Sequence, residues 1–447
     1  MPVIKAFFKS LYIRERFFYI SLGIILLFII SFIFPKLFYI SKLLLLVFAT
    51  FTILDIFILY VTKTGITGTR QVPDKFSNGD ENDVFLRLEN YYTFPIFTKI
   101  IDEIPEQFQV RNFSIEKKIK ASSVIELKYK LRPTERGEYT FGRLNIYVHS
   151  VLGLISRRFF FDGEVMVPTY PAFLQLKKYD LLAIGNNLTM YGIKKIRRIG
   201  HTMEFEQIKE YVIGDDLRTI NWKATAKQRH LMVNQYQDEK SQPVYSVIDK
   251  GRMMKMPFNG LSLLDYAINA TLVMSNVVLK KQDKAGMFTF SKRVENTVIA
   301  EKRSSQMNLI LESLYNIDTN FFESDYGRLY ANIKQNIKHR SLLLLYTNFE
   351  TVEALNRQLP YLKGIAKSHL LVVIFFKNTE LDQLIDNEAT TIQEAYDKVI
   401  AEKFSFEKRL IVNELKKYGI HSILTTPENL TIDAINKYLE MKARGLV

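Results

Sequence analysis

The sequence predicts a mixed fold class: two N-terminal transmembrane helices, then a small β-sandwich, then an α/β domain with a doubly wound parallel sheet. Three observations predict it. Two long apolar stretches open the chain, alternating strand-like segments follow, and apolar runs then alternate with helical segments. The boundaries that we expect are a membrane anchor over residues 1–70, the sandwich over 71–171, a connecting segment over 172–242 and the α/β domain over 243–447.

The two apolar stretches have the length of membrane spans. Residues 17–34 contain no charged residue, and residues 43–61 contain only Asp55. A helix rises about 1.5 Å per residue, so each stretch nearly crosses a hydrocarbon core. The connection at residues 35–42 is short, which predicts a tight helical hairpin. A signal peptide followed by a buried core helix is the alternative, but no small-residue cleavage site follows Phe34.

The basic residues around the hairpin predict its orientation, because Lys and Arg favour the cytoplasmic side of a membrane. They are denser at the outer ends than in the loop, so we expect both ends, and the soluble part, in the cytoplasm. Asp55 is costly in lipid and is therefore a candidate for function, or for pairing inside the hairpin or an oligomer. The basic residues are Lys5, Lys9, Arg14 and Arg16 before the first stretch, Lys36 and Lys42 in the loop, and Lys63 and Arg70 after the second stretch.

Residues 71–171 show the period of two that half-buried strands require. Residues 84–90 and 124–131 alternate apolar and polar side chains, and turn-forming segments such as residues 77–80 (SNGD) separate the strands. Several short strands at this spacing predict a β-sandwich. It contains no catalytic constellation, so we expect it to space or present the C-terminal domain.

The C-terminal half alternates strands with helices. Residues 244–249, 342–346 and 370–376 are mostly or wholly apolar runs, as strands buried on both faces of a parallel sheet are. Ligands of such sheets bind beyond the carboxyl ends of the strands. The residues that follow Ile248 and Tyr346 are therefore the first candidates for a functional site.

Composition excludes several classes of site. The 447 residues include no cysteine, which rules out disulfides, thiolate metal sites and cysteine nucleophiles. The sequence has no phosphate-cradling glycine-rich loop, no nucleophile-elbow serine and no His-Glu-x-x-His, and its six histidines do not stand at metal-ligand spacing. We therefore expect neither an enzyme nor a cofactor. The net charge of +14 indicates an anionic neighbour, such as an acidic protein, nucleic acid or lipid headgroups.

A basic run at residues 194–198 (KKIRR) is one candidate for such a contact. We favour a solvated loop as its interpretation, with anionic lipid as the alternative, because the chain is tethered to a membrane in any case. Nucleic acid is not expected as a partner, since no recognised binding module surrounds the run and Tyr191 alone gives no stacking pattern.

The densest cluster of functional-looking residues lies at residues 211–227, which contain the single tryptophan of the chain. Residues 214–227 (GDDLRTINWKATAK), then LMVNQYQDEK and VYSVIDKGRMM, resemble bacterial membrane proteins of domain-of-unknown-function family 58. The resemblance implies two membrane spans, a β-rich segment and a von Willebrand factor A-like domain. It also implies multi-pass location in the bacterial inner membrane, an AAA ATPase of MoxR type as partner, and no assigned enzymatic activity.

The resemblance raises the question of a metal site, because von Willebrand A domains often hold Mg²⁺ through Asp-x-Ser-x-Ser and later Thr and Asp residues. Such hard cations prefer carboxylate and hydroxyl oxygens. Asp249 is present, but Gly251 and Met253 stand where the motif has its two serines. After the strand at residues 342–346, Thr347 offers a hydroxyl, and Asn348 offers an amide where an acid would help. We expect this degenerate site to bind no metal, and Asp249 to close its strand, cap a turn or pair with Arg252.

The cluster itself predicts a short brace. Asp216 follows a flexible glycine and is a good N-cap, so we expect one helix from there to about residue 226. Arg218 and Trp222 are four residues apart, which places them on one helix face with the guanidinium on the indole. The helix is predicted to pin residues 231–237 against the α/β domain. The partner-binding residues that we predict are Asp215, Asp216, Arg218, Trp222 and Lys223, with Lys227 on the same basic surface.

Two classes of function are left open, apart from a purely structural brace. The first is a membrane-anchored scaffold or adaptor whose A-like domain binds a protein partner during assembly or maturation of a complex. The second is a metal-dependent or hydrolytic enzyme of unknown substrate. The loop at Asp249 discriminates between them, and its lost hydroxyl positions favour the first.

Overall fold

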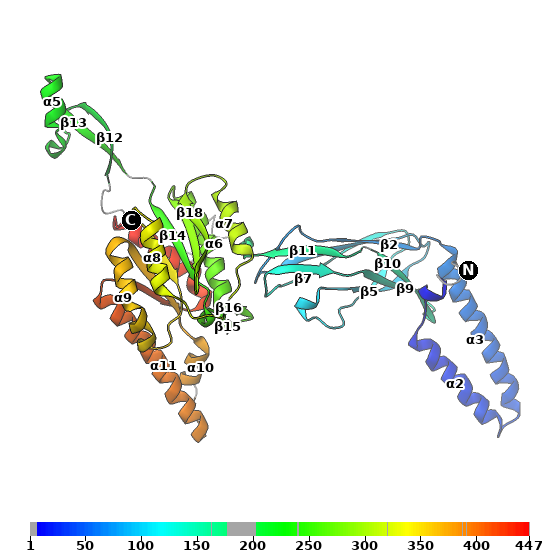
Figure 1. Cartoon of the computed structure of the whole chain (residues 1–447). Helices are drawn as coiled ribbons and strands as arrows, with labels where there is room; N and C mark the ends of the chain where they lie inside the picture. Colours follow the sequence, from blue (N-terminus) through cyan, green and yellow to red (C-terminus); the bar gives the residue numbers. More distant parts are fainter. Residues whose placement is uncertain are drawn as a thin grey trace. The chain divides into compact units, whose positions relative to one another are not determined.

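The computed structural model describes residues 7–161, 163–176, 203–238, 241–319, 321–386, 388–389 and 391–446. The chain divides into two units, Met1–Thr169 (unit 1) and Tyr170–Val447 (unit 2), and each is described by itself. Figure 1 shows the elements of both. The basic run at residues 194–198 lies outside the described residues, so its interpretation as a loop stays a prediction.

Unit 1 contains two helices that run antiparallel as a hairpin, α2 (Glu15–Ser31) and α3 (Lys36–Val61) (Figure 1). Within the described residues, α3 alone is long and apolar enough to cross a membrane by length and composition. The expected loop at residues 35–42 is wrong, because α3 begins at Lys36, directly after Pro35 at its N-cap. Proline is compatible with a helix start, and no helix breaker follows it before α3 is established.

The rest of unit 1 consists of antiparallel sheets around one core, as the period-two pattern predicts. Val84, Leu86 and Leu88 point inward from a single strand and are fully buried together with Phe141 and Ile146. One sheet has the order β1 (Leu11–Ile13), β10 (Ile155–Phe161), β9 (Leu144–His149), β5 (Ile96–Asp102), β6 (Ile115–Ile119); the others are β2 (Ile66–Gln71), β4 (Asn82–Asn90), β7 (Val124–Leu131) and β3 (Phe76–Ser77), β11 (Val165–Tyr170), β8 (Gly137–Phe141).

The segments directly before and after the helical hairpin are strands of these sheets. The strand before α2, β1, pairs with β10, and the strand after α3, β2, pairs with β4. The C-terminus of α3 is held by Arg157, whose guanidinium donates hydrogen bonds to the carbonyls of Leu59 (2.8 Å), Thr62 (2.8 Å) and Lys63 (3.0 Å). A cation at this end of a helix satisfies unpaired carbonyls and the negative end of the helix dipole.

Asp55 joins α3 to the sheets. Its carboxylate is fully buried and accepts hydrogen bonds from Ser150 Oγ (2.5 Å) and from the backbone N–H groups of Leu154 (3.0 Å) and Ile155 (3.2 Å). The last turns of α3 therefore lie against the β-rich part of unit 1. Asp55 is thus paired with the loop before β10 and not within the helical hairpin, whereas a functional role and pairing in an oligomer stay predictions.

Unit 2 contains a six-stranded sheet that is parallel except at one edge. Its core strands are the predicted apolar runs, and they are buried on both faces. The strand order is β18 (Val294–Glu301), β17 (Lys284–Phe290), β14 (Pro243–Asp249), β19 (Leu342–Tyr346), β20 (Leu370–Phe376), β21 (His421–Thr425). The antiparallel edge strand β18 was not among the predicted strands, since the exposed Ile299 lies between the buried Val298 and Ala300 and hides the alternation of apolar and polar residues.

Helices cover both faces of this sheet, so the doubly wound arrangement is confirmed in its coarse form (Figure 1). One core contains α6 (Leu263–Lys280), α7 (Gln306–Tyr315) and α12 (Leu430–Ala443), and the other contains α8 (Tyr326–Asn336), α9 (Val352–Ser368) and α11 (Ile392–Lys417). A shorter helix, α10 (Thr379–Asp386), follows β20. The entry to α6 is fixed by a capping box in which Ser262 and Asp265 each accept a backbone N–H.

Residues 203–238 form a separate antiparallel hairpin, which we call the arm. Its strands are β12 (Met203–Glu210) and β13 (Met232–Asp238). Between them lie a 3₁₀ turn, η3 (Leu217–Thr219), and a two-turn helix, α5 (Trp222–Gln228). The predicted GDDLRTINW cluster therefore occupies the end of the arm, where β12 turns into β13 (Figure 1).

Candidate functional site

Asp249 lies at the carboxyl end of β14, where the sheet predicts a site. One carboxylate oxygen, Oδ1, accepts hydrogen bonds from the Gly251 N–H (2.8 Å) and from Ser324 Oγ. The other, Oδ2, accepts from Thr347 Oγ1 (2.7 Å) and the Tyr326 hydroxyl (3.3 Å). Thr347 is beside Asp249 because β14 and β19 are parallel neighbours that end at the same edge, with Ile248 opposite Tyr346.

Burial dominates the electrostatics of this cluster. Asp249 is only 4% exposed, and burial raises the pKa of its carboxyl group, while hydrogen bonds from its four donors act in the opposite direction. Burial and the nearby charge of Asp249 raise the pKa of Tyr326 well above its usual value. The tyrosine hydroxyl therefore keeps its proton and remains a donor.

The residues at the expected metal-ligand positions have other surroundings in the structure. A Cβ at Gly251 would lie 2.2 Å from Ser324 Oγ, so a side chain at this position would displace the hydroxyl that Asp249 uses. Met253 instead lines a small cavity of about 100 Å³ beside Asp249. Asn348 turns to other partners, because its Oδ1 accepts from the Lys408 ammonium (2.8 Å) and its Nδ2 donates to Glu350 (2.7 Å).

Metal binding at this edge therefore lacks a prepared ligand set. All four donors around Asp249 occupy the carboxylate oxygens that a cation would need. No group of three or more His, Cys, Asp or Glu residues is placed to hold a metal in the described part of the chain. The neighbouring Lys250 is buried and paired with Glu295, which removes its charge from Asp249. That the site binds no metal stays a prediction.

Sequence reasoning missed three residues at this edge: Ser324, Tyr326 and Lys408. Lys408 projects from α11, and its ammonium donates to the Asn348 side chain and to the Phe349 carbonyl (2.6 Å). Burial lowers the pKa of Lys408, and the carboxylate of Glu350 (3.5 Å) opposes that shift. Lys408 thus fixes the loop after β19. A lysine inside a long helix gives no local signal of this contact.

The second candidate site is the end of the arm, where the predicted single helix is wrong. Asp216 does act as a cap, but of η3, by accepting the Arg218 N–H (2.9 Å). Asn221 then caps α5 by accepting the Ala224 N–H (3.0 Å). The asparagine divides the segment because its side chain takes the N–H that a continuous helix would use. Arg218 and Trp222 consequently lie on different elements, and no cation–π contact joins them in this described segment.

Hydrogen bonds join the segment at residues 221–225 to β13, although Trp222 does not contribute by burial. The Asn221 N–H donates to the Met232 carbonyl (2.9 Å), and the Met232 N–H donates to Thr225 Oγ1 (3.0 Å). Asp215 accepts hydrogen bonds from the Val212 N–H and from Lys209 (both 3.0 Å), and these two bonds, in that order, lower its pKa. Contact of the arm with the α/β sheet stays a prediction.

The most unusual feature of the arm is its exposed apolar surface. Ile213 is 95% exposed and Trp222 is 70% exposed, with Val212 and Leu217 close to the latter value. We call these four residues the arm tip. The same segment carries three basic side chains that form no ion pair within the described residues, and these are Arg218, Lys223 and Lys227.

Comparison with known proteins finds a family of unknown function. The family model "Protein of unknown function DUF58" matches residues 207–387, which run from β12 in the arm to the end of α10 and make up less than half of the chain. The uncharacterized protein YeaD of Bacillus subtilis (strain 168) is 23% identical over 222 residues, 48% of this chain and 53% of that protein. The chain thus spans about half the length of this curated relative. The predicted resemblance is confirmed at this coarse level.

Similar solved structures add no argument. Proximal thread matrix protein 1 from the mussel byssus is 11% identical, with a TM-score of 0.25, and the match covers 44% of this chain and 45% of that one. The PapD-like domain 7 of human CEP192 is 14% identical, with a TM-score of 0.19, and the match covers 24% of this chain and 87% of that one. Both scores are too low to decide a fold.

Proposed function

We propose that this chain is a membrane-anchored adaptor and not an enzyme. In this proposal, α2 and α3 tie the β-rich part of unit 1 to a bacterial cytoplasmic membrane, and the von Willebrand A-like unit 2 binds a protein partner through the arm tip. The candidate partner is an AAA ATPase of MoxR type, which the family resemblance suggests. The observation that carries the proposal is the exposure of the four large apolar side chains of the arm tip.

The anchor is supported by how the hairpin enters unit 1. Because β1 and β2 are strands of the same sandwich, both outer ends of the hairpin lie on one side, and α2 and α3 cross a bilayer together or not at all. The part of α3 before Asp55 is about 28 Å long and α2 about 26 Å, close to the thickness of a hydrocarbon core. Phe32, at the turn, is 92% exposed, as a lipid-facing side chain is.

The same topology argues against a cleaved signal sequence. Cleavage after α2 would remove β1 and leave the edge of β10 unpaired. Arg14 and Arg16 stand between β1 and the body of α2, and Lys63 follows α3, so the positive charges gather at the sandwich end of the hairpin. This distribution supports a cytoplasmic location of the soluble part.

A topology experiment tests the anchor. A tag at the C-terminus and external protease on intact spheroplasts should leave the tag uncleaved, whereas lysed cells lose it. Cleavage of the tag from outside would contradict the cytoplasmic orientation. Extraction of the full chain by carbonate at high pH would contradict the anchor itself.

Partner binding by the arm tip is supported by its composition. The centre of a protein interface is enriched in aromatic side chains and Arg and poor in acids, and a few such residues supply most of the binding energy. Trp222 and Ile213 supply the apolar part, and η3 in the same segment supplies Arg218. A partner with an apolar groove and acidic margins would complement this surface. The Asp249 cluster supports a non-enzymatic role, because its carboxylate is fully engaged by structural donors.

The binding experiment uses the full chain in nanodiscs and the purified MoxR-type ATPase encoded in the same genome. Trp222→Ala and Arg218→Glu should each lower capture of the ATPase about tenfold or more, since hot-spot residues contribute about 2 kcal/mol or more. Leu309→Ser is the matched control, because Leu309 is also an exposed apolar residue but lies on α7. Normal capture by folded Trp222→Ala and Arg218→Glu proteins would refute docking at the arm and leave only the brace.

A further inference from the structure

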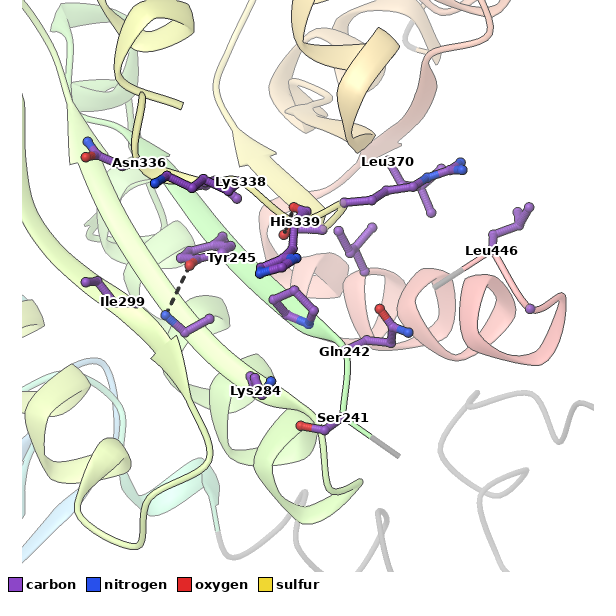
Figure 2. A pocket seen from close by; sticks show the side chains of 17 residues that line it. Ser241, Gln242, Tyr245, Lys284, Ile299, Asn336, Lys338, His339, Leu370 and Leu446 are labelled. Carbon is purple, nitrogen blue, oxygen red and sulfur yellow. Dashed lines mark hydrogen bonds between the residues drawn. The ribbon is translucent and has the colours of Figure 1, made fainter. Parts of the chain in front are cut away.

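A second concave site lies at the amino ends of the α/β sheet strands, whereas Asp249 lies at their carboxyl ends. A cavity of about 730 Å³ opens at the amino ends of β14 and β17, and Figure 2 shows its lining. Gln242 directly precedes β14, and Tyr245 lies near its start. Lys284 begins β17, and Lys338 and His339 come from the segment between α8 and β19. No local sequence pattern marks this end of the sheet, because these residues are scattered along the chain.

The charged side chains of this cavity all have the same sign. Lys284, Lys338 and Arg340 line it together with His339, and no Asp or Glu is among its described lining residues. In the described part of the chain, no ion pair neutralises these three cations. Cations that converge on one cavity without a counter-ion favour an anionic ligand.

Two acidic residues that adjoin lining residues of the cavity in sequence, Asp283 and Glu301, are already paired with cations. Asp283, the neighbour of Lys284, is buried and accepts hydrogen bonds from Tyr438 (2.5 Å), the Gln242 N–H (3.1 Å) and the Lys442 ammonium. Glu301, which lies opposite Ala285 on β18, is paired with Arg303 (2.5 Å). Neither carboxylate is left over to balance the charge of the cavity.

The wall also offers hydrogen-bond donors that the fold does not use. Ser241 Oγ is buried and has no hydrogen-bond partner in the described structure, which is a costly state for a hydroxyl. The Tyr245 hydroxyl accepts from the Ala300 N–H (3.3 Å), as the dashed line in Figure 2 shows, and this leaves its own proton for another acceptor. A ligand with acceptor oxygens would satisfy both groups.

The cavity also has an apolar side and the size of a small-molecule site. Ile299, Leu370 and Leu446 line it beside the ring of Tyr245. Small organic ligands occupy pockets of about 300–1,000 Å³ that combine apolar walls with a few placed polar groups. In Figure 2, Lys338 and His339 lie near Tyr245, while Lys284 and Ser241 lie further along the strands.

From this arrangement we infer that the cavity binds a small organic phosphate of about nucleotide size. Its phosphate groups bind the cations of the cavity, which are Lys284, Lys338 and Arg340, and also the Ser241 hydroxyl. Ammonium, guanidinium and hydroxyl donors recognise phosphate oxygens. Its organic part packs on Tyr245, Ile299 and Leu446. This site is independent of the adaptor role, because it uses no residue of the arm tip or of the Asp249 cluster.

The test is a calorimetric titration of the full chain in nanodiscs with ADP and with inorganic pyrophosphate. ADP should bind, and more tightly than pyrophosphate, because only ADP uses the apolar wall. Lys338→Gln/Arg340→Gln should weaken ADP binding at least tenfold, and Ser241→Ala should weaken it a few-fold. Lys334→Gln is the control for lost charge, because Lys334 is exposed on α8 outside the cavity, and it should bind ADP as the wild type does.

Three results would overturn the inference. The first is no binding of ADP at millimolar concentration to the folded wild type. The second is equal affinity in the double variant, whose folding is checked by its melting temperature, with Lys338→Gln alone as the milder substitute. The third is displacement of ADP from the wild type by polyglutamate at lower concentration, since this would assign the cavity to an acidic polypeptide.

Discussion

Asp55 in unit 1 and Asp249 in unit 2 are both buried carboxylates that receive several hydrogen bonds, but their donors differ. Two of the three donors to Asp55 are backbone N–H groups, of Leu154 and Ile155. Three of the four donors to Asp249 are hydroxyls, of Ser324, Tyr326 and Thr347. A hydroxyl rotates and also accepts, whereas a backbone N–H has one direction and one role. Asp55 therefore holds α3 against the β-rich part of unit 1 in one geometry, and we call this contact the fixed joint. The hydrogen bonds around Asp249 are able to rearrange.

The largest expected effect follows from the fixed joint. Asp55→Ala leaves two buried N–H groups and the Ser150 hydroxyl without an acceptor, at a cost of about 2–6 kcal/mol for the two N–H groups. Hydrogen exchange of the full chain should show lost protection of the Leu154 and Ile155 amides. Ser150→Ala is the control and should cost less, about 1–2 kcal/mol, because the carboxylate keeps its two N–H donors and only the part-buried Leu152 N–H loses its acceptor. Equal protection in Asp55→Ala and wild type would mean that Asp55 is no joint.

A smaller effect, with a defined pH dependence, is expected at Asp249. Asparagine has the same shape, and the rotating hydroxyls are able to accept from its amide, so Asp249→Asn should fold. Because burial raises the pKa of Asp249 above 3.8, the folded protein holds a proton that the unfolded chain has lost. The wild type therefore loses stability as pH rises from about 3.8 through the folded pKa, and the asparagine variant does not.

Melting temperatures of both proteins between pH 4 and pH 8 test this sign. The advantage of Asp249→Asn over the wild type should grow as pH rises and then level off. Thr347→Ser is a useful companion, since it keeps the hydroxyl and should follow the wild-type profile. A difference that stays constant, or that shrinks, across this range would contradict a raised pKa at Asp249.

The smallest effect on stability is expected at the arm tip, which is the exposed counterpart of these two buried sites. Trp222→Ala should change the free energy of unfolding by less than about 0.5 kcal/mol, because the indole is 70% exposed. Thr225→Ala should cost more, about 1 kcal/mol, since it removes the acceptor of the Met232 N–H. Thermal unfolding of the two variants distinguishes them. A larger loss for Trp222→Ala would mean that the indole is buried in the working protein.

The comparison also shows what the sequence was able to predict. The elements that it identified have strong local patterns, such as the alternation in β4 and the apolar runs of β19 and β20. The end of β14 was also predicted, because the acid Asp249 follows an apolar run and marks where that run stops. Thr347 was placed at the same site, because it follows a neighbouring parallel strand. Ser324 and Tyr326 were not predictable, because they lie 75 and 77 positions further along the chain and before the next strand of the sheet.

Short or irregular elements were missed for a different reason. β1 has only three residues and lies beside an apolar helix, so no period is visible. Asn221 interrupts the cluster helix because its side chain competes with the backbone, although the periodicity of Leu217, Ile220 and Ala224 is helical. In both places a single local contact overrides the pattern that the surrounding residues suggest.

The pairing of β1 with β10 sets the order in which unit 1 is able to assemble. Tyr12 of β1 and its hydrogen-bond partner Arg158 of β10 are separated by 146 positions. At about 5–20 residues per second, a ribosome needs on the order of ten seconds to make the partner strand after it has made β1. Both hairpin helices are synthesised within that interval. β1 therefore waits, unpaired, until the hairpin is complete, and closing the sandwich is a late step that depends on where the hairpin has placed the N-terminus.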